Sequence, residues 1–116
     1  VTLINNLAVN NSGQWIVEAD TDNVDTNADE VLIKTGSLYL REGQALIGLA
    51  VGTLDSFDSI NINSAGNSGW NFFLAGTAGL STDSGMFYNG TMIFQESTIS
   101  TAPQFSPGTP YIGFFR

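Results

Sequence analysis

Residues 31–42 read VLIKTGSLYLRE, and residues 85–96 read GMFYNGTMIFQE. The two stretches align without a gap, so that Gly36 matches Gly90 at a distance of 54 positions. In both stretches, short runs of alternating apolar and polar residues flank a glycine turn, which predicts two β-strands joined as a hairpin. Asn89-Gly90 is the stronger turn signal, because both residues accept the positive φ of a type I′ turn.

Further matches occur before each hairpin. LAVN at 7–10 is echoed by ININ at 60–63, and each is followed by a polar turn that contains glycine. A strand that begins with tryptophan comes next, at Trp15 and again at Trp70, 55 positions later. The sequence therefore predicts one motif written twice, with a period of about 54 residues.

Each repeat supplies about four strands, and no apolar stripe of helical spacing is long enough for a helix. We predict an all-β fold of two four-stranded antiparallel repeat units, arranged as propeller-like blades or as a sandwich, with an extra C-terminal strand. Residues 1–116 are expected to form a single domain. Within it, repeat units span 1–53 and 54–97, and the tail at 98–116, which contains prolines, holds a closing or donated strand.

The large side chains of the two hairpins alternate along their strands. Since such residues usually fill a core, we expect all of them to be buried. They are Leu32, Lys34, Leu38 and Leu40 in the first hairpin, and Met86, Tyr88, Met92 and Phe94 in the second.

The composition excludes several classes of function. The chain has no histidine and no cysteine, so Ser-His and Cys-His catalytic pairs, histidine-zinc sites and disulfides are excluded within one chain. Its net charge of −8 opposes binding to nucleic acid, and no apolar run approaches the roughly 20 residues needed for membrane insertion. An acidic, lysine-poor composition rich in Asn, Ser, Thr and Gly is typical of secreted or surface proteins, so we expect that location.

The order of these motifs resembles tandem β-repeats of large secreted bacterial surface proteins of unknown function, often described as propeller-like. The resemblance covers about four-fifths of the chain, and its motifs are turn and strand residues, none of them catalytic. It therefore implies an architecture more than an activity. The matching segments are 10–15 (NNSGQW), 19–21 (ADT), 30–36 and 41–43 (REG) in the first repeat unit, and 63–70 and 85–96 in the second.

Six of the eleven acidic residues fall within residues 18–30. Alternating carboxylates and asparagines in a loop can surround a hard cation such as Ca²⁺ with oxygen ligands, and a solvated acidic loop is the alternative. The candidate ligands are Asp20, Asp22, Asp25 and Asp29.

Two other kinds of site are considered. Trp15 and Trp70 could stack on sugar rings, which would make the chain a carbohydrate-binding module, although both are equally suited to a core. Glu42 and Glu96 match in the two repeat units and could form the carboxylate pair of a glycosidase. We expect instead that they end strands at exposed rims, and that the protein is not an enzyme.

The leading hypothesis is a structural role. Two small sheets leave free strand edges, and such edges favour pairing with other copies of the chain or with neighbouring repeats. We predict self-assembly through strand edges or termini, and the alternative is a lectin-like module that binds glycans with the aid of calcium. The residues expected to mediate assembly are Tyr111, Ile112, Phe114 and Phe115.

Overall fold

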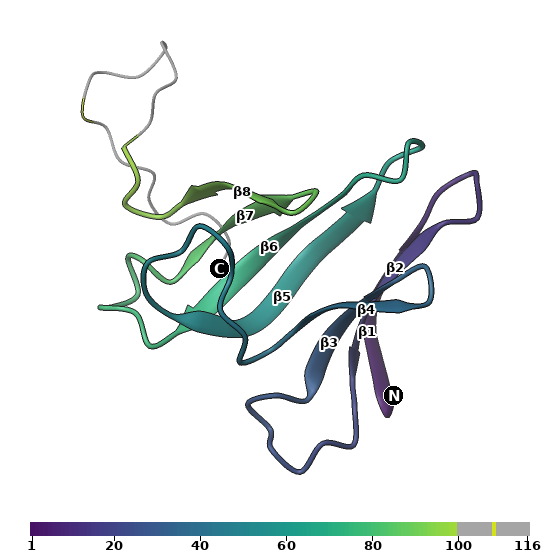
Figure 1. Cartoon of the computed structure of the whole chain (residues 1–116), viewed down its shortest axis with the longest axis horizontal. Helices are drawn as coiled ribbons and strands as arrows, with labels where there is room; N and C mark the ends of the chain where they lie inside the picture. The colour runs from purple at the N-terminus through teal and green to yellow at the C-terminus, as the bar shows by residue number, and fades with distance from the viewer. Residues whose placement is uncertain (100–107, 109–116) are drawn as a thin grey trace.

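The computed structural model describes residues 1–99 and 108, and within them the chain forms eight strands and no helix. Both sheets are antiparallel meanders in chain order (Figure 1). The first sheet contains β1 (Leu3–Val9), β2 (Trp15–Asp20), β3 (Glu30–Lys34) and β4 (Ser37–Arg41). The second sheet contains β5 (Thr53–Ile62), β6 (Ser68–Ala75), β7 (Ser84–Tyr88) and β8 (Thr91–Gln95).

The predicted all-β fold with two four-stranded antiparallel units is confirmed. The extra C-terminal strand expected in the tail lies outside the described residues.

Local turn chemistry explains the two hairpins. In the first, Thr35 and Gly36 have φ of 47° and 85°, and in the second Asn89 and Gly90 have φ of 49° and 86°. Positive φ at both central residues defines a type I′ turn, whose twist matches that of the flanking strands. β7 and β8 begin and end 54 positions after β3 and β4, and both hairpins contain a register shift at the same point, after Leu32 and after Met86.

The turn that follows each hairpin shows how one position accepts two residue types. Gly43 has φ of 81°, and a Cβ there would lie 2.9 Å from the carbonyl oxygen of Asn27. Ser97 stands at the matching position with φ of 64°, and its hydroxyl donates to the carbonyl oxygen of Ser81 at 2.6 Å. The left-handed backbone is therefore kept in both places, with glycine required only where the backbone approaches closely.

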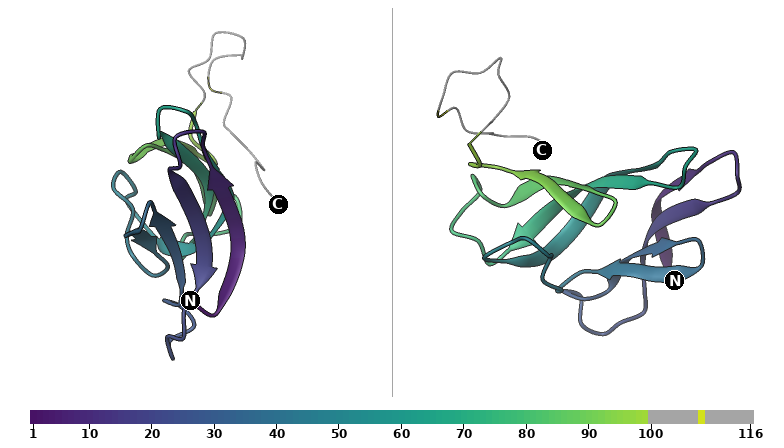
Figure 2. Two further views of the ribbon diagram at one scale, coloured as in Figure 1. Left: turned by 90° about the vertical axis from the view of Figure 1, so that its right-hand side faces the viewer. Right: turned by 45° about the horizontal axis from the view of Figure 1, so that its top comes forward.

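The hydrophobic core lies between the two sheets, where β5 packs against β1 and β2 (Figure 2). The inner face of the first sheet contributes Ala8, Ile16, Leu32 and Leu40. The inner face of the second sheet contributes Leu54, Phe57, Ile60, Ile62, Trp70, Phe72, Leu74 and Phe87.

Trp70 lies within an aromatic group in this core and is 1 % exposed. Its ring is stacked on Phe87 at 5.2 Å and meets Tyr39 edge to face at 5.1 Å. Aromatic contacts of this kind add to the free energy gained by removing the rings from water. Trp70 therefore ties a strand of the second sheet to the last strand of the first.

Polar contacts also join the sheets. The Nζ of Lys34 donates to the Oγ of Ser68 at 3.0 Å, and it lies 5.4 Å from the centre of the Tyr39 ring. The Nδ2 of Asn10 donates to the carbonyl oxygen of Asn63 at 2.9 Å, so the first turn of one sheet is bonded to the first turn of the other. These bonds fix the register between the two sheets.

The expectation that all the large hairpin residues are buried is wrong for Leu38 and Tyr88, which are 58 % and 41 % exposed. In the first hairpin, the register shift places Leu38 opposite Ile33 and Leu40 opposite Leu32, so Leu38 and Leu40 lie on different faces. Only the face with Leu40 meets the other sheet.

The two tryptophans should differ in what they contribute to stability. We expect Trp70→Ala to lower the free energy of unfolding by about 3–5 kcal/mol, since it removes a large side chain from the core. Trp15→Ala should cost only about 1 kcal/mol, because Trp15 is half-buried. Urea titrations followed by circular dichroism would measure both, and equal losses would contradict this description of the core.

Candidate functional site

The first sheet has one face that no other sheet covers within the described residues. Side chains alternate along β2, so Ile16 points into the core while Trp15, Val17 and Ala19 point to the opposite side. Together with neighbours on β1 and β3 they surround a hollow of about 550 Å³. We call this surface the open face; it is lined by Val1, Ile4, Leu7, Val9, Trp15, Val17, Ala19 and Ile33.

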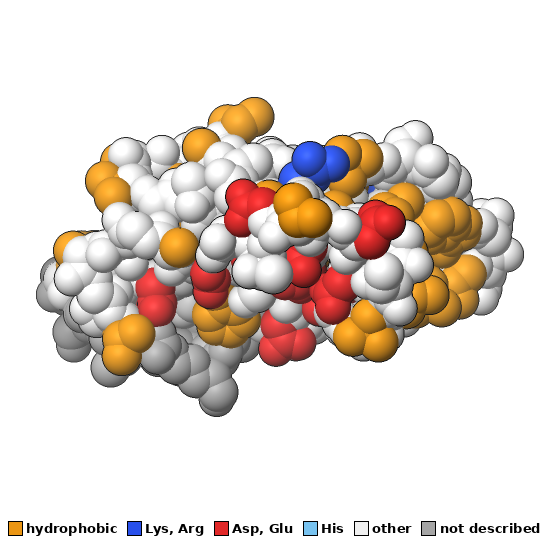
Figure 3. Space-filling view, turned by 90° about the horizontal axis from the view of Figure 1, so that it is seen from below, with side chains coloured by type: hydrophobic (Ala, Val, Ile, Leu, Met, Phe, Trp, Pro, Cys, Tyr) orange, Lys and Arg blue, Asp and Glu red, His pale blue; other side chains and the backbone are white. Residues whose placement is uncertain are grey.

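The open face is entirely apolar in its lining and is well exposed along the edge strand β1, whereas Val17 and Ala19 on the neighbouring β2 are buried. Ile4, Leu7 and Val9 are 61 %, 60 % and 64 % exposed. Figure 3 shows hydrophobic side chains gathered at the end of the molecule that the first sheet occupies, beside a band of acidic side chains. A contiguous apolar surface of this kind usually marks a binding surface.

The matching positions of the second sheet are buried. Trp70, Phe72 and Phe87 of the second sheet are between 0 % and 3 % exposed because they pack on the first sheet. They match Val17, Ala19 and Ile33, because Trp70 pairs with Phe87 as Val17 pairs with Ile33. The match of Trp15 with Trp70 expected from the sequence is wrong: Trp15 stands at the place of Ser68, 53 positions later. The same positions thus build the core in one sheet and the open face in the other.

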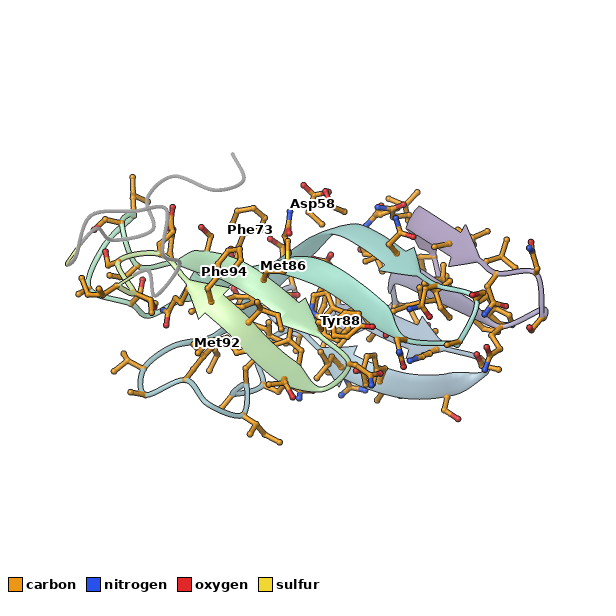
Figure 4. The ribbon with its side chains drawn as sticks, turned by 90° about the horizontal axis from the view of Figure 1, so that it is seen from above. Asp58, Phe73, Met86, Tyr88, Met92 and Phe94 are labelled. Carbon is orange, nitrogen blue, oxygen red and sulfur yellow. The ribbon has the colours of Figure 1, made fainter. Side chains whose placement is uncertain are left out.

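The second sheet has an outer face of its own, which points away from the first sheet. A groove of about 420 Å³ crosses it, and Asn61, Asn71, Met86 and Tyr88 are among the residues that line this groove. Figure 4 labels Phe73, Met86 and Phe94, which come from β6, β7 and β8. Asn71 pairs with Met86, and Met86 pairs with Phe94, so these side chains run across the sheet on one face.

A pair of glutamates lies at the junction between the sheets. Glu18 is 7 % exposed on β2, and its carboxylate is hydrogen-bonded to the carboxyl group of Glu30 on β3. The backbone amide of Phe57, on β5, donates to the Oε1 of Glu30 at 3.4 Å. An acidic pair of one sheet therefore touches the backbone of the other.

Glu30 holds the shared proton. Burial, the hydrogen bond to Glu18 and repulsion from Glu18 raise the pKa of Glu30 to about 8, and the Phe57 amide opposes the rise only in part. Burial also raises the pKa of Glu18, while the hydrogen bond from Glu30 lowers it. Two carboxylates this close cannot both ionise readily, so one remains neutral at pH 7.

The four aspartates considered as calcium ligands do not come together. Asp20 accepts a hydrogen bond from Asn5 at 3.0 Å, and Asp25 accepts one from the backbone of Asn27 at 3.1 Å. Among residues 1–99 and 108, no group of three acidic side chains is arranged to hold a metal ion. Asp22 and Asp29 thus belong to a loop that is organised by its own hydrogen bonds.

The tryptophans considered for sugar stacking lie in different surroundings. Trp70 is in the core, so its ring offers no face to a ligand. Trp15 is half-buried at the open face among aliphatic side chains. The expected assembly residues, Tyr111, Ile112, Phe114 and Phe115, lie outside the described part of the chain.

Glu42 and Glu96 were expected at exposed rims, and this expectation is wrong: they are 9 % and 4 % exposed. The Oε2 of Glu42 accepts a hydrogen bond from the amide of Glu30 at 3.3 Å, which draws the side chain onto the backbone of β3. Burial raises the pKa of Glu42, with a smaller effect from repulsion by Asp29. Glu42 thus lies beside the Glu18–Glu30 pair, and we call these three residues the acidic junction.

Reasoning from the sequence missed the Glu18–Glu30 pair, because the whole run 18–30 was treated as a loop. A signal was present: Glu18 continues the alternation of β2, and the hairpin register pairs it with Leu32, two residues after Glu30. Residues at such diagonal positions share a face of the sheet.

Comparisons with known proteins give no relative. No family model matches the chain, and no curated protein and no solved structure matches it significantly. In the part of the chain that the structure describes, no helix has the length and apolar character needed to span a membrane.

The acidic junction should make stability depend on pH. The pKa of Glu30 is about 8 in the folded protein and near 4.5 in the unfolded chain. The free energy of unfolding is therefore highest at low pH, and it falls as the pH rises from about 4.5 through about 8. Glu30→Gln should therefore melt higher than wild type at pH 9, by about 4 °C or more, with little difference at pH 5. Thermal melts followed by circular dichroism would measure this.

Asp22→Asn is the matched control, since it removes the same charge from an exposed loop position. It should follow the pH dependence of the wild type. A Glu30→Gln protein that melts lower than wild type at pH 9 would contradict a protonated Glu30.

Proposed function

We propose that this is a structural protein that assembles with copies of itself or with neighbouring repeats of the same kind. The observation that carries the proposal is the open face, where apolar side chains such as Leu7 and Val9 stand exposed. Removing apolar surface from water is the main driving force of association. A secreted or surface location and a net charge of −8, which opposes indiscriminate clumping, fit this role.

The two sheets are, in this proposal, two units of one tandem repeat. The support is the common spacing: β3 with β7 and β4 with β8 are separated by 54 positions at both ends. The hairpin turns share their backbone conformation, and both hairpins shift register at matching residues. In a row of such repeat units, each unit buries one face against the next. The first unit of the row therefore keeps one face that no neighbour covers.

A contact through a sheet face differs from the strand-edge or tail contact favoured by the sequence. The edge strands β1 and β4 can still pair with another chain. The open face, however, offers a hollow lined by eight residues that removes apolar side chains from water, whereas an edge offers chiefly backbone hydrogen bonds. We therefore place the main contact on the face.

Carbohydrate binding is a second candidate, because the groove of the outer face combines asparagines with the exposed ring of Tyr88. Asparagine amides and an aromatic face are groups that recognise sugars. A glycan array would test it: binding that is lost in Tyr88→Ala, with unchanged folding, would support this candidate.

The proposed assembly can be tested by mass in solution. We expect sedimentation velocity to give species heavier than the 12.3 kDa chain, with the average mass rising with concentration. Leu7→Asp should shift the protein toward the monomer, because it places a charge on the open face. A wild-type chain that stays monomeric at all concentrations would refute self-assembly.

Val24→Asp serves as the matched control. Val24 is 99 % exposed and lies in the acidic loop, away from the residues that line the open face. The substitution adds the same charge to an exposed apolar residue, so it should leave the mass distribution as in wild type.

A further inference from the structure

We infer that the open face of one copy docks on the outer face of the second sheet of another copy, so that copies join head to tail. The inference rests on the proposed function, and it names the surface that receives the open face. The two surfaces differ, so the contact is heterologous. Each copy binds one neighbour through its open face and another neighbour through its outer face.

The first argument is that the chain already contains such a contact. Inside the molecule, Trp70, Phe72 and Phe87 of the second sheet pack on the inner face of the first. The matching positions on the first sheet, Val17, Ala19 and Ile33, line the open face. The open face thus carries the pattern that, in the second sheet, covers a neighbouring sheet.

The receiving surface matches in the same way. The inner face of the first sheet, which receives the second, includes Ile16, Leu32 and Leu40. At the matching places, the outer face of the second sheet carries Gly69, Met86 and Phe94, of which Figure 4 labels the last two. Among the described residues, one copy therefore carries one surface of each kind that no other sheet covers.

The chemistry of the outer face suits an apolar partner. The inner face of the first sheet carries Glu18 and Lys34, whose polar groups are satisfied by Glu30 and Ser68. At the matching positions the outer face carries Asn71 and Tyr88, neither of which bears a charge. Docking the open face there would remove the Tyr88 ring from water without burying charged groups, which are costly if left unpaired.

The groove lies where the matching contact would fall. Inside the chain, Trp70 meets Tyr39 beside Lys34. The residue of the open face that matches Trp70 is Val17. The residue of the outer face that matches Lys34 is Tyr88, which lines the groove of about 420 Å³ together with Met86. The same packing between copies would therefore place Val17 and its neighbours on the open face over this groove.

A polar link is also repeated. The Oδ1 of Asn10 accepts bonds from the amides of Ser12 and Gln14, both at 3.0 Å, which leaves its Nδ2 to reach Asn63. The Oδ1 of Asn63 accepts bonds from the amides of Ala65 and Asn67, also at 3.0 Å. Its Nδ2 is thereby turned to donate to the carbonyl of Asn10 in the next copy.

The test mixes two variants, each with one damaged surface. Leu7→Asp damages the open face, and Tyr88→Asp damages the outer face; both positions are exposed, so the chain should still fold. Each variant alone should be monomeric. An equimolar mixture should form a 1:1 complex of twice 12.3 kDa and nothing larger, because one intact surface of each kind remains. Far-ultraviolet circular dichroism and thermal melts confirm that both variants fold.

The other outcomes overturn the inference in distinct ways. If Tyr88→Asp assembles as wild type while Leu7→Asp does not, the open face pairs with itself or with another surface such as the C-terminal segment. If both variants assemble as wild type, the contact uses strand edges. If both are monomeric and the mixture forms no complex, the two faces do not meet. Only a wild-type chain that is itself monomeric would refute self-assembly as a function.

Discussion

The contact between the two inner faces is the constraint on which this structure depends. A single four-stranded sheet cannot form a hydrophobic core by itself. Each sheet is therefore stable only when another layer covers one of its apolar faces. Trp70 and Phe72, which are at most 1 % exposed, supply much of that cover from the second sheet. Since each of the two described sheets has two faces, one contact leaves one face on each sheet that no other sheet covers within residues 1–99.

The same contact between the sheets also removes carboxyl groups of the acidic junction from water. Glu18 and Glu30 are drawn from water by the approach of β5, and they stay there by sharing a proton and by accepting the amide of Phe57. A polar pair in such a place adds little stability and is sensitive to its protonation state. The outer face of the second sheet has Asn71 where the first has Glu18, and Ser84 where it has Glu30, so it carries no such pair of carboxyl groups.

The sequence was sufficient for the local structure. Asn89-Gly90 specified its turn through positive φ, and alternation specified the strands around it, because both depend on neighbours in the chain. It was insufficient for deciding which side of each strand is covered. Trp70 and its equivalent Val17 lie on matching strands, but Trp70 faces the first sheet and Val17 lines the open face, a difference that long-range contacts decide.

The same reason explains the errors at the candidate sites. The run of acidic residues at 18–30 predicts one acidic loop, although Glu18 lies within β2, Glu30 begins β3, and the sheet contact buries both. Leu38 was assigned to the core, although the register shift in its hairpin turns it to the other side. Both depend on the packing of one sheet on another.

The relation between the two sheets has a geometric consequence. A rotation and a translation carry the first sheet onto the second, and in a head-to-tail assembly the same operation would be applied again at every step. With no translation along the axis, the successive sheets would close into a ring once the rotations sum to a full turn. With some translation they would form a helical filament whose two ends expose different surfaces, so that each end could be capped by a different molecule.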